Sequence, residues 1–232
     1  MTAPYLILAI VEGHGEQKAV PLLLRRWFEH RRFRNFETRE LAIRAPGAGA
    51  LKCPYDPIQG TGIEYYIELA AGERPDGILV VLDADDECQE RAKDRRRLGL
   101  GPELLQRARR IAPHVPIEVV VANREYEVWF LAALDTLRRV GSLPRGKRWE
   151  KSISDIESIR DCKKPLTYLL GRPYEETTDQ TDFTETLPFT ATMARRSRSY
   201  RKLMDALQAL TQAARTHRRG RMLASPKRTR PR

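Results

Sequence analysis

Acidic side chains follow three separate apolar runs of this 232-residue sequence. Glu12 comes directly after YLILAIV, Asp83 and Asp85 come after GILVVL, and Glu125 and Glu127 follow PIEVVVA after a short interval. Mg²⁺ prefers oxygen ligands, usually one or two carboxylates together with water and a substrate phosphate. If these side chains meet, the chemistry they indicate is metal-assisted cleavage of a phosphoester. Each acid taken alone also fits a solvated turn, so the prediction depends on their convergence.

The apolar runs before these acids are typical of strands that are covered on both faces. They alternate with segments of helical periodicity, which predicts an α/β fold with a mostly parallel sheet flanked by helices. In such sheets, sites form just beyond the carboxyl ends of the strands, where the acids stand. The expected strands are residues 5–11, 37–44, 77–82 and 116–122, and the expected helices begin after residue 15, span 63–71 and 101–111, and end near residue 140.

Beyond residue 140 the sequence changes to helical segments and polar loops. We expect residues 1–140 to form the α/β metal-binding domain and residues 141–214 to form a helical extension packed on it, with helices over 150–159, 165–170 and 199–214. The stretch 45–62, rich in Gly and Pro, and the Thr-rich stretch 177–192 are expected to be loops. Residues 215–232 form a basic tail, which should be disordered when free because like charges repel and few large apolar residues are present.

Most of the positive charge lies in this tail. The formal net charge is +11, and residues 215–232 contribute +8 of it through seven Arg and one Lys with no acid, which leaves +3 for residues 1–214. A basic tail can add sequence-independent attraction to phosphate backbones. A solvated tail without a specific partner is the alternative that the sequence leaves open.

Composition indicates a cytoplasmic protein without a membrane segment. The chain is 41% hydrophobic, yet no apolar run approaches the roughly 20 residues that a membrane helix needs, and a signal-peptide pattern is absent. Three widely spaced cysteines, Cys53, Cys88 and Cys162, favour reduced thiols over a disulfide framework or a CxxC zinc site.

The turn after the first expected strand, EGHGEQK at residues 12–18, does not match a phosphate-binding loop. It lacks both GxxxxGK[ST] and GxGxxG. A Gly-rich turn at a helix start can still offer N–H groups to an anion. Glu12 and Glu16 beside it favour a metal ion instead.

Three motifs together resemble a known domain. The order of Glu12-Gly-x-x-Glu16 and Asp83-x-Asp85 resembles the TOPRIM domain, which topoisomerases, bacterial primases and OLD-type nucleases share. The stretch NREYEVWFLA at 123–132 resembles the RExExW motif of domain-of-unknown-function family forty-two seventy-six, which is related to OLD-type nucleases. KKPL at 163–166 and SRSYRKL at 197–203 resemble later segments of that family, so the similarity covers roughly residues 5 to 210.

The resemblance implies a TOPRIM-like site for Mg²⁺, with Mn²⁺ as a substitute. Asp83 and Asp85 would hold the metal, Glu12 would be a ligand or a general base, and Glu16 would belong to the catalytic set. Glu125 completes that set. Glu127 remains the alternative to Glu125, because side chains two apart on a helix diverge by roughly 200°.

Basic residues near the third motif would contact the substrate. Arg124, Lys163 and Lys164 could steady a phosphate or its transition-state charge, although each also fits a surface charge. The expected activity is Mg²⁺-dependent hydrolysis of DNA or RNA phosphodiesters in anti-phage or mobile-element defence. Any ATPase partner would be a separate protein because this chain has no P-loop. The alternative is a non-catalytic regulatory or nucleic-acid-binding subunit of an ATPase complex with a degenerate site. The oligomeric state stays open.

Overall fold

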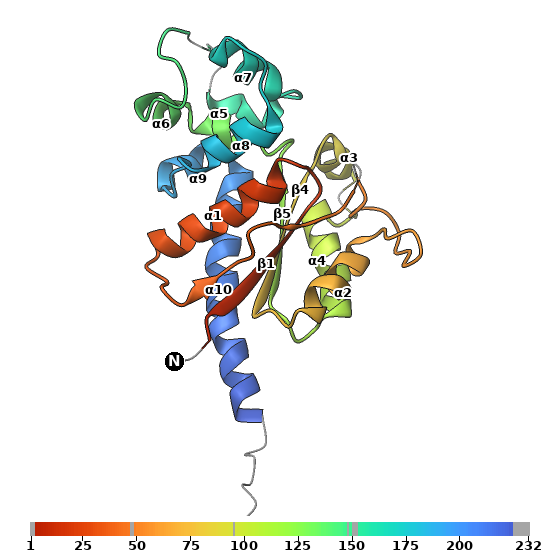
Figure 1. The fold of residues 1–232 in the computed structure, drawn as a ribbon. Coiled ribbons are helices and arrows are strands. Elements are labelled where there is room, and N and C mark those ends of the chain that lie inside the picture. The colour runs from red at the N-terminus through yellow and green to blue at the C-terminus, as the bar shows by residue number, and fades with distance from the viewer. Residues whose placement is uncertain (1–2, 47–48, 95, 148, 150–152, 225–232) are drawn as a thin grey trace, which may run out of the picture.

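The computed structural model describes residues 3–46, 49–94, 96–147, 149 and 153–224, which form an α/β fold around one five-stranded sheet (Figure 1). The described strands pair in parallel in the order β2-β1-β4-β5, and β3 also pairs with β1. The strands are β1 (Tyr5–Val11), β2 (Phe36–Glu37), β3 (Ile43–Arg44), β4 (Gly77–Asp83) and β5 (Ile117–Ala122). The expected α/β class and parallel sheet are therefore confirmed.

Helices cover both faces of the sheet, which explains why β1 and β4 are apolar throughout. On one face, α1 (Glu16–His30) and α10 (Arg198–Ala224) pack against alternate residues such as Ile7 and Leu79. On the other face, α2 (Ile63–Gly72) and α4 (Leu100–Ile111) pack against Leu8 and Val80. A short helix, α3 (Glu87–Ala92), follows β4.

A group of helices gathers beyond the carboxyl ends of the strands, at the top of Figure 1. It combines helices of the extension expected after residue 140 with two helices within residues 128–139, which the sequence had assigned to the α/β domain. Its aromatic side chains belong to the same core as one face of the sheet: Phe130 and Phe183 lie with ring centroids 5.3 Å apart, and Trp129 and Tyr200 lie 5.7 Å apart. This group of helices therefore covers the edge of the sheet where the acids lie. Its elements are α5 (Val128–Ala132), α6 (Leu134–Arg139), the 3₁₀ helix η1 (Ile153–Ser158), α7 (Lys163–Leu170), α8 (Glu176–Thr184) and α9 (Ala191–Arg196).

The continuous strand expected over residues 37–44 is wrong. Only its two ends pair with β1, with Leu6 opposite Glu37 and Ile10 opposite Ile43. Between them the backbone turns to α1, where Ala42 donates its N–H to the carbonyl of Gln17 at 2.8 Å. A contact from outside the sheet therefore interrupts the strand.

Three helix and loop predictions also need correction. The Thr-rich loop expected over 177–192 contains α8, since the burial of Phe183 outweighs the weak helix propensity of threonine. The helix expected to continue to residue 140 is broken at Ala133 into α5 and α6. Instead of an α-helix over 150–159, the chain forms η1 over Ile153–Ser158, and residues 150–152 lie outside the described part.

The segment expected to be a disordered tail begins as helix. Helix α10 continues to Ala224, so residues 215–224 are helical, and residues 225–232 lie outside the described part. Arg218 forms an ion pair with the buried Asp76 and also donates to the carbonyls of Ala3 and Pro4. Contacts with the start of the chain thus offset the repulsion among like charges. Within the described residues, no helix is both long enough and apolar enough to span a membrane.

Candidate functional site

The carboxyl ends of β1, β4 and β5 lie at one edge of the sheet, as parallel pairing requires. Asp83, the last residue of β4, stands opposite Ala122, the last residue of β5. The loops that leave these strands are tied together, because Ala84 and Asp85 both donate their N–H groups to the carbonyl of Arg124, at 2.9 and 3.0 Å. The second and third acidic segments are therefore neighbours.

Asp83 is the centre of the acidic cluster. Its Oδ1 accepts the backbone N–H of Tyr126 at 2.8 Å. Burial raises the pKa of this partly buried carboxyl well above its usual range, and the charges of nearby carboxylates raise it further. Those carboxylates, in order of decreasing effect, belong to Glu16, Glu127, Glu125 and Asp85. Acids from all three strand exits thus act on one side chain.

Glu16 reaches the cluster because Gly13 leaves room for it. A Cβ atom at Gly13 would lie 1.8 Å from Oε2 of Glu16, so any other residue there would displace this carboxylate. The other oxygen, Oε1, accepts a hydrogen bond from Nε2 of the buried Gln180 on α8 at 3.1 Å. Gly13 and Gln180 together hold Glu16 toward the sheet edge.

Glu12 and Asp85 lie around the ammonium group of Lys52. Glu12 accepts the N–H of Leu51 at 3.2 Å, and its pKa is raised by burial, an effect that the charge of Lys52 partly offsets. The Nζ atom of Lys52 lies 3.2 Å from Oδ2 of Asp85, 3.4 Å from the carbonyl oxygen of Asp83 and 3.9 Å from a carboxylate oxygen of Glu87. Asp85 itself has φ +50°, a left-handed conformation that Asp tolerates better than most residues.

Contacts with α4 hold Lys52 in place. Arg107 of α4 donates to the carbonyls of Lys52 at 3.1 Å and Cys53 at 2.6 Å, and it forms a two-point ion pair with Glu64. The side chain of Lys52 is only 15% exposed. The acidic cluster therefore contains a positive charge from the protein itself, the ammonium group of Lys52, which we call the built-in cation.

Glu125 and Glu127 both precede α5, so the helical divergence expected for them does not apply. Glu125 accepts the N–H of Cys162 at 3.0 Å, and burial raises its pKa. Glu127 is only 2% exposed, and burial raises its pKa to about 7, although the charge of Lys163 opposes the rise. The charges of both carboxylates raise the pKa of Asp83, and Glu127 raises it more than Glu125 does.

The three expected phosphate contacts have protein partners. Arg124, 11% exposed at its side chain, forms an ion pair with Asp86. Lys163 forms an ion pair with Glu176. Burial lowers the pKa of Lys163, but the bond to Glu176 and the charges of nearby carboxylates together have a larger effect, so its pKa is raised. Lys164 points to solvent, with an exposed fraction of 84% and an ion pair with Asp161.

The donor set suits a hard cation by its chemistry. Six carboxyl groups, those of Glu12, Glu16, Asp83, Asp85, Glu125 and Glu127, belong to this cluster. Lys52 lies beside Glu12 and Asp85, and Lys163 lies near Glu125 and Glu127, so the carboxyl groups outnumber the ammonium groups. Oxygen is the ligand that Mg²⁺ requires. Within the described residues, however, no three acidic, His or Cys side chains stand close enough to form a preassembled metal site. A cation would therefore require side-chain rotations around Asp83.

Sequence reasoning missed three residues of this region, Lys52, Gln180 and Tyr174, and it gave Glu127 only as the alternative to Glu125. Lys52 and Gln180 come from segments predicted as loops. The Tyr174 hydroxyl group is buried, and burial together with the charge of Glu127 raises its pKa. Only for Glu127 did the sequence carry a signal, its place in the third motif.

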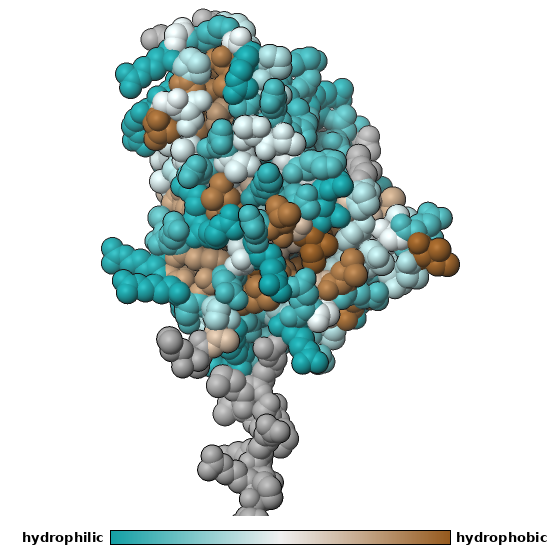
Figure 2. Space-filling view, viewed as in Figure 1, coloured by the Kyte–Doolittle hydropathy of each residue, from teal (hydrophilic) through white to brown (hydrophobic). Residues whose placement is uncertain are grey.

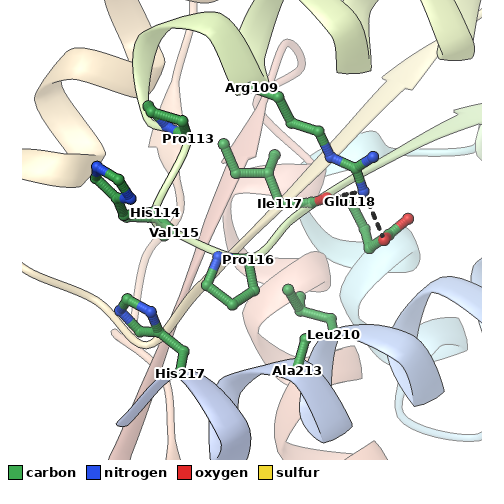
Figure 3. Close-up of a pocket in the computed structure, with 10 residues that line it drawn as sticks. All are labelled: Arg109, Pro113, His114, Val115, Pro116, Ile117, Glu118, Leu210, Ala213 and His217. Carbon is green, nitrogen blue, oxygen red and sulfur yellow. Dashed lines mark hydrogen bonds and ion pairs between the residues drawn. The ribbon is translucent and has the colours of Figure 1, made fainter. Parts of the chain in front are cut away.

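Two hollows lie along β5, one at the end away from the acidic cluster and one that leads toward it. One of about 350 Å³ lies at the opposite end of β5, where His114, Pro116 and His217 line it beside the Arg109–Glu118 ion pair (Figure 3). A groove of about 730 Å³ follows the open side of β5 between α4 and α10, and ends at Asn123 and Glu157. The groove ends beside Asn123, two residues before Glu125.

Comparison of the chain with protein-family models, with curated proteins and with solved structures finds no match.

Proposed function

We propose that this protein is a Mg²⁺-dependent nuclease that hydrolyses nucleic-acid phosphodiesters. The observation that carries the proposal is the position of Asp83 at the carboxyl edge of a parallel sheet, where the charges of four other carboxylates raise its pKa. Such a concentration of half-buried negative charge is costly unless a cation or protons neutralise it. Perturbed carboxyl groups gathered at a strand edge are typical of catalytic sites.

Asp83, Asp85 and Glu12 would hold the cation, which would polarise a phosphoryl oxygen and lower the pKa of a bound water. Glu127, with a pKa of about 7, is suited to accept a proton near neutral pH. Lys163 lies near Glu125 and Glu127 and could stabilise charge on the phosphate. The groove along β5 carries Arg198 and Lys202 and offers a path for a strand toward Asn123.

The test is cleavage of single- and double-stranded DNA and RNA by purified protein with Mg²⁺ or Mn²⁺. Asp83→Asn should reduce the rate by at least about 100-fold, since it removes the central ligand but keeps the shape and the acceptor for the Tyr126 N–H. Asp182→Asn, the same change at an exposed position on α8, should leave the rate unchanged. Equal rates in wild type and Asp83→Asn would refute the site.

The built-in cation favours a second candidate function, a non-catalytic subunit. Lys52 already partly neutralises Glu12 and Asp85, as expected of a degenerate site that binds nucleic acid or a partner without cleaving. Titration calorimetry with Mg²⁺ and Mn²⁺ separates the two candidates. Metal binding that is lost in Asp83→Asn supports the nuclease, and absence of binding to the wild type supports the subunit.

The resemblance to OLD-type nucleases extends the proposal to defence against phage or mobile elements. In that setting the chain would act with an ATPase encoded separately. Co-purification of the tagged chain with an ATPase from its own cells, followed by a nuclease assay with and without ATP, tests this extension.

A further inference from the structure

The end of α1 and the residues after it carry an unusual density of arginines. Residues 25–34 read RRWFEHRRFR, with five Arg and one Glu. Arg26 is turned inward, where it donates to the carbonyls of Thr184 at 2.9 Å and Leu187 at 2.7 Å. Arg32, with φ +56°, turns the chain as the helix ends. The remaining arginines stay at the surface.

Three of these arginines rim a hollow with an aromatic floor. The hollow has a volume of about 410 Å³, and its lining includes Arg25, Arg32, Arg34, Phe28, Phe33 and Phe36. Ring centroids of Phe36 and Phe28 are 5.3 Å apart, as are those of Phe36 and Phe33. Phe33 is the most exposed of the three rings. Near the end of α1, Figure 2 shows apolar side chains open to view between hydrophilic ones.

Helix α10 completes this basic hollow. The guanidinium carbon of Arg215 lies 4.3 Å from the ring centroid of Phe33 and 5.4 Å from that of Phe36. Arg218 lies 4.0 Å from the ring centroid of Tyr5, which in turn stacks on Phe36. The beginning of the basic segment predicted as a tail therefore supports the floor of the hollow and adds charge to its rim.

The positive charge of the hollow is largely uncompensated. Among the described residues, no carboxylate forms an ion pair with Arg25, Arg32, Arg34 or Arg215, and Glu29 is the acid that lines the hollow. The ion pairs of other arginines, such as Arg39 with Glu73, show that surface acids are available elsewhere. Such a surface attracts a polyanion.

We propose that this basic hollow binds single-stranded nucleic acid, with phosphates on the arginine rim and a base that takes the place of the Arg215 guanidinium on the ring of Phe33. Aromatic rings bind bases of any sequence through their faces, and arginines track the backbone. Duplex bases are already stacked on one another, so a duplex could reach the arginines but not the ring. The single strand is therefore the form that fits both features.

The basic hollow lies at the far end of α1 from Glu16. Fifteen helical residues at 1.5 Å each span about 22 Å, which is the distance a bound strand must cross between the basic hollow and the acids. The hollow could thus hold a strand whose continuation reaches the acids. This link to cleavage rests on the proposed nuclease function, whereas binding in the hollow does not.

Fluorescence anisotropy in EDTA measures binding without cleavage. Labelled dT20 and rU20 strands are compared with a 20-base-pair duplex over a range of salt concentrations. The triple variant Arg25→Ala/Arg32→Ala/Arg34→Ala should bind single strands at least about tenfold more weakly, and the slope of log affinity against log salt should shrink by about 2, at roughly 0.7 per phosphate contact. The control Arg110→Ala/Arg139→Ala/Arg145→Ala removes three exposed arginines elsewhere and should change neither.

Phe33→Leu keeps apolar bulk but removes the ring. It should weaken single-strand binding about tenfold, with little effect on the salt slope or on the duplex. Thermal unfolding confirms that each variant is folded. Equal weakening by both triple variants, no effect of Phe33→Leu, or equal competition by poly-glutamate would overturn the proposal, the last in favour of an acidic protein partner.

Cleavage of bis(p-nitrophenyl) phosphate, which is too small to reach the hollow, separates this proposal from the nuclease function. The Arg25/Arg32/Arg34 triple variant should cleave it at the wild-type rate. If the wild type does not cleave it and does not cut nucleic acid, the nuclease function fails, and the anisotropy result still decides the binding proposal.

Discussion

Replacing Glu127 by Gln should stabilise the metal-free protein at neutral and alkaline pH. Glu127 is 2% exposed, and burial raises its pKa from 4.5 to about 7, although the charge of Lys163 opposes the rise. A carboxyl group whose pKa is higher in the folded state binds its proton more tightly there than in the unfolded chain. The folded protein therefore loses stability as the pH rises from about 4.5 through 7.

The size of the effect follows from the pKa. Each pKa unit corresponds to about 1.4 kcal/mol, so the rise from 4.5 to about 7 corresponds to roughly 3 kcal/mol at pH 8. Glutamine has the same shape but no charge to bury, so Glu127→Gln should recover most of this amount at pH 8 and almost none at pH 4.5. For a chain of this length, roughly 3 kcal/mol raises the melting temperature by about 6–12 °C.

Thermal and urea unfolding in EDTA at pH 4.5, 6 and 8 measure the difference. Glu185→Gln, the same substitution at an exposed position after α8, is the control and should change stability little at any pH. A variant that is less stable than wild type at pH 8, or a difference that does not vary with pH, would refute the view that Glu127 is a buried and poorly compensated charge. Added Mg²⁺ should stabilise the wild type more than the variant if the cation neutralises this cluster.

Two further substitutions test the surroundings of the site. Lys52→Met removes the ammonium group next to Asp85 and should tighten Mn²⁺ binding at pH 8 on the order of tenfold. Titration calorimetry measures the affinity. Unchanged or weaker binding would mean that Lys52 does not compete with the metal. Arg218→Ala removes the guanidinium that pairs with the buried Asp76 and should lower the free energy of unfolding by about 2–3 kcal/mol in urea. Arg219→Ala, at the exposed neighbouring position, should cost little, and equal effects of the two variants would show that α10 does not depend on this pair.

The chain order of apolar runs was enough to predict the fold class and the edge where the acids stand. YLILAIV and GILVVL are typical of strands covered on both faces, which requires helices on both sides. Parallel pairing then brings all carboxyl ends to one edge, so the sequence alone predicted that Glu12, Asp83 and Glu125 lie near one another. These conclusions depend on local pattern and on connectivity, which a sequence carries directly.

The environment of each acid depended on contacts between segments distant in the chain. Lys52 and Gln180 reach the acids from stretches predicted as loops, because Arg107 holds one stretch and the burial of Phe183 makes the other a helix. The basic segment after residue 214 begins as helix since Asp76, 142 residues away, compensates Arg218. Burial and ion pairing depend on which residues become neighbours in the folded chain, and periodicity and composition do not identify these neighbours. Only the tertiary structure therefore showed that burial raises the pKa of Glu127 and that a basic hollow lies at the end of α1.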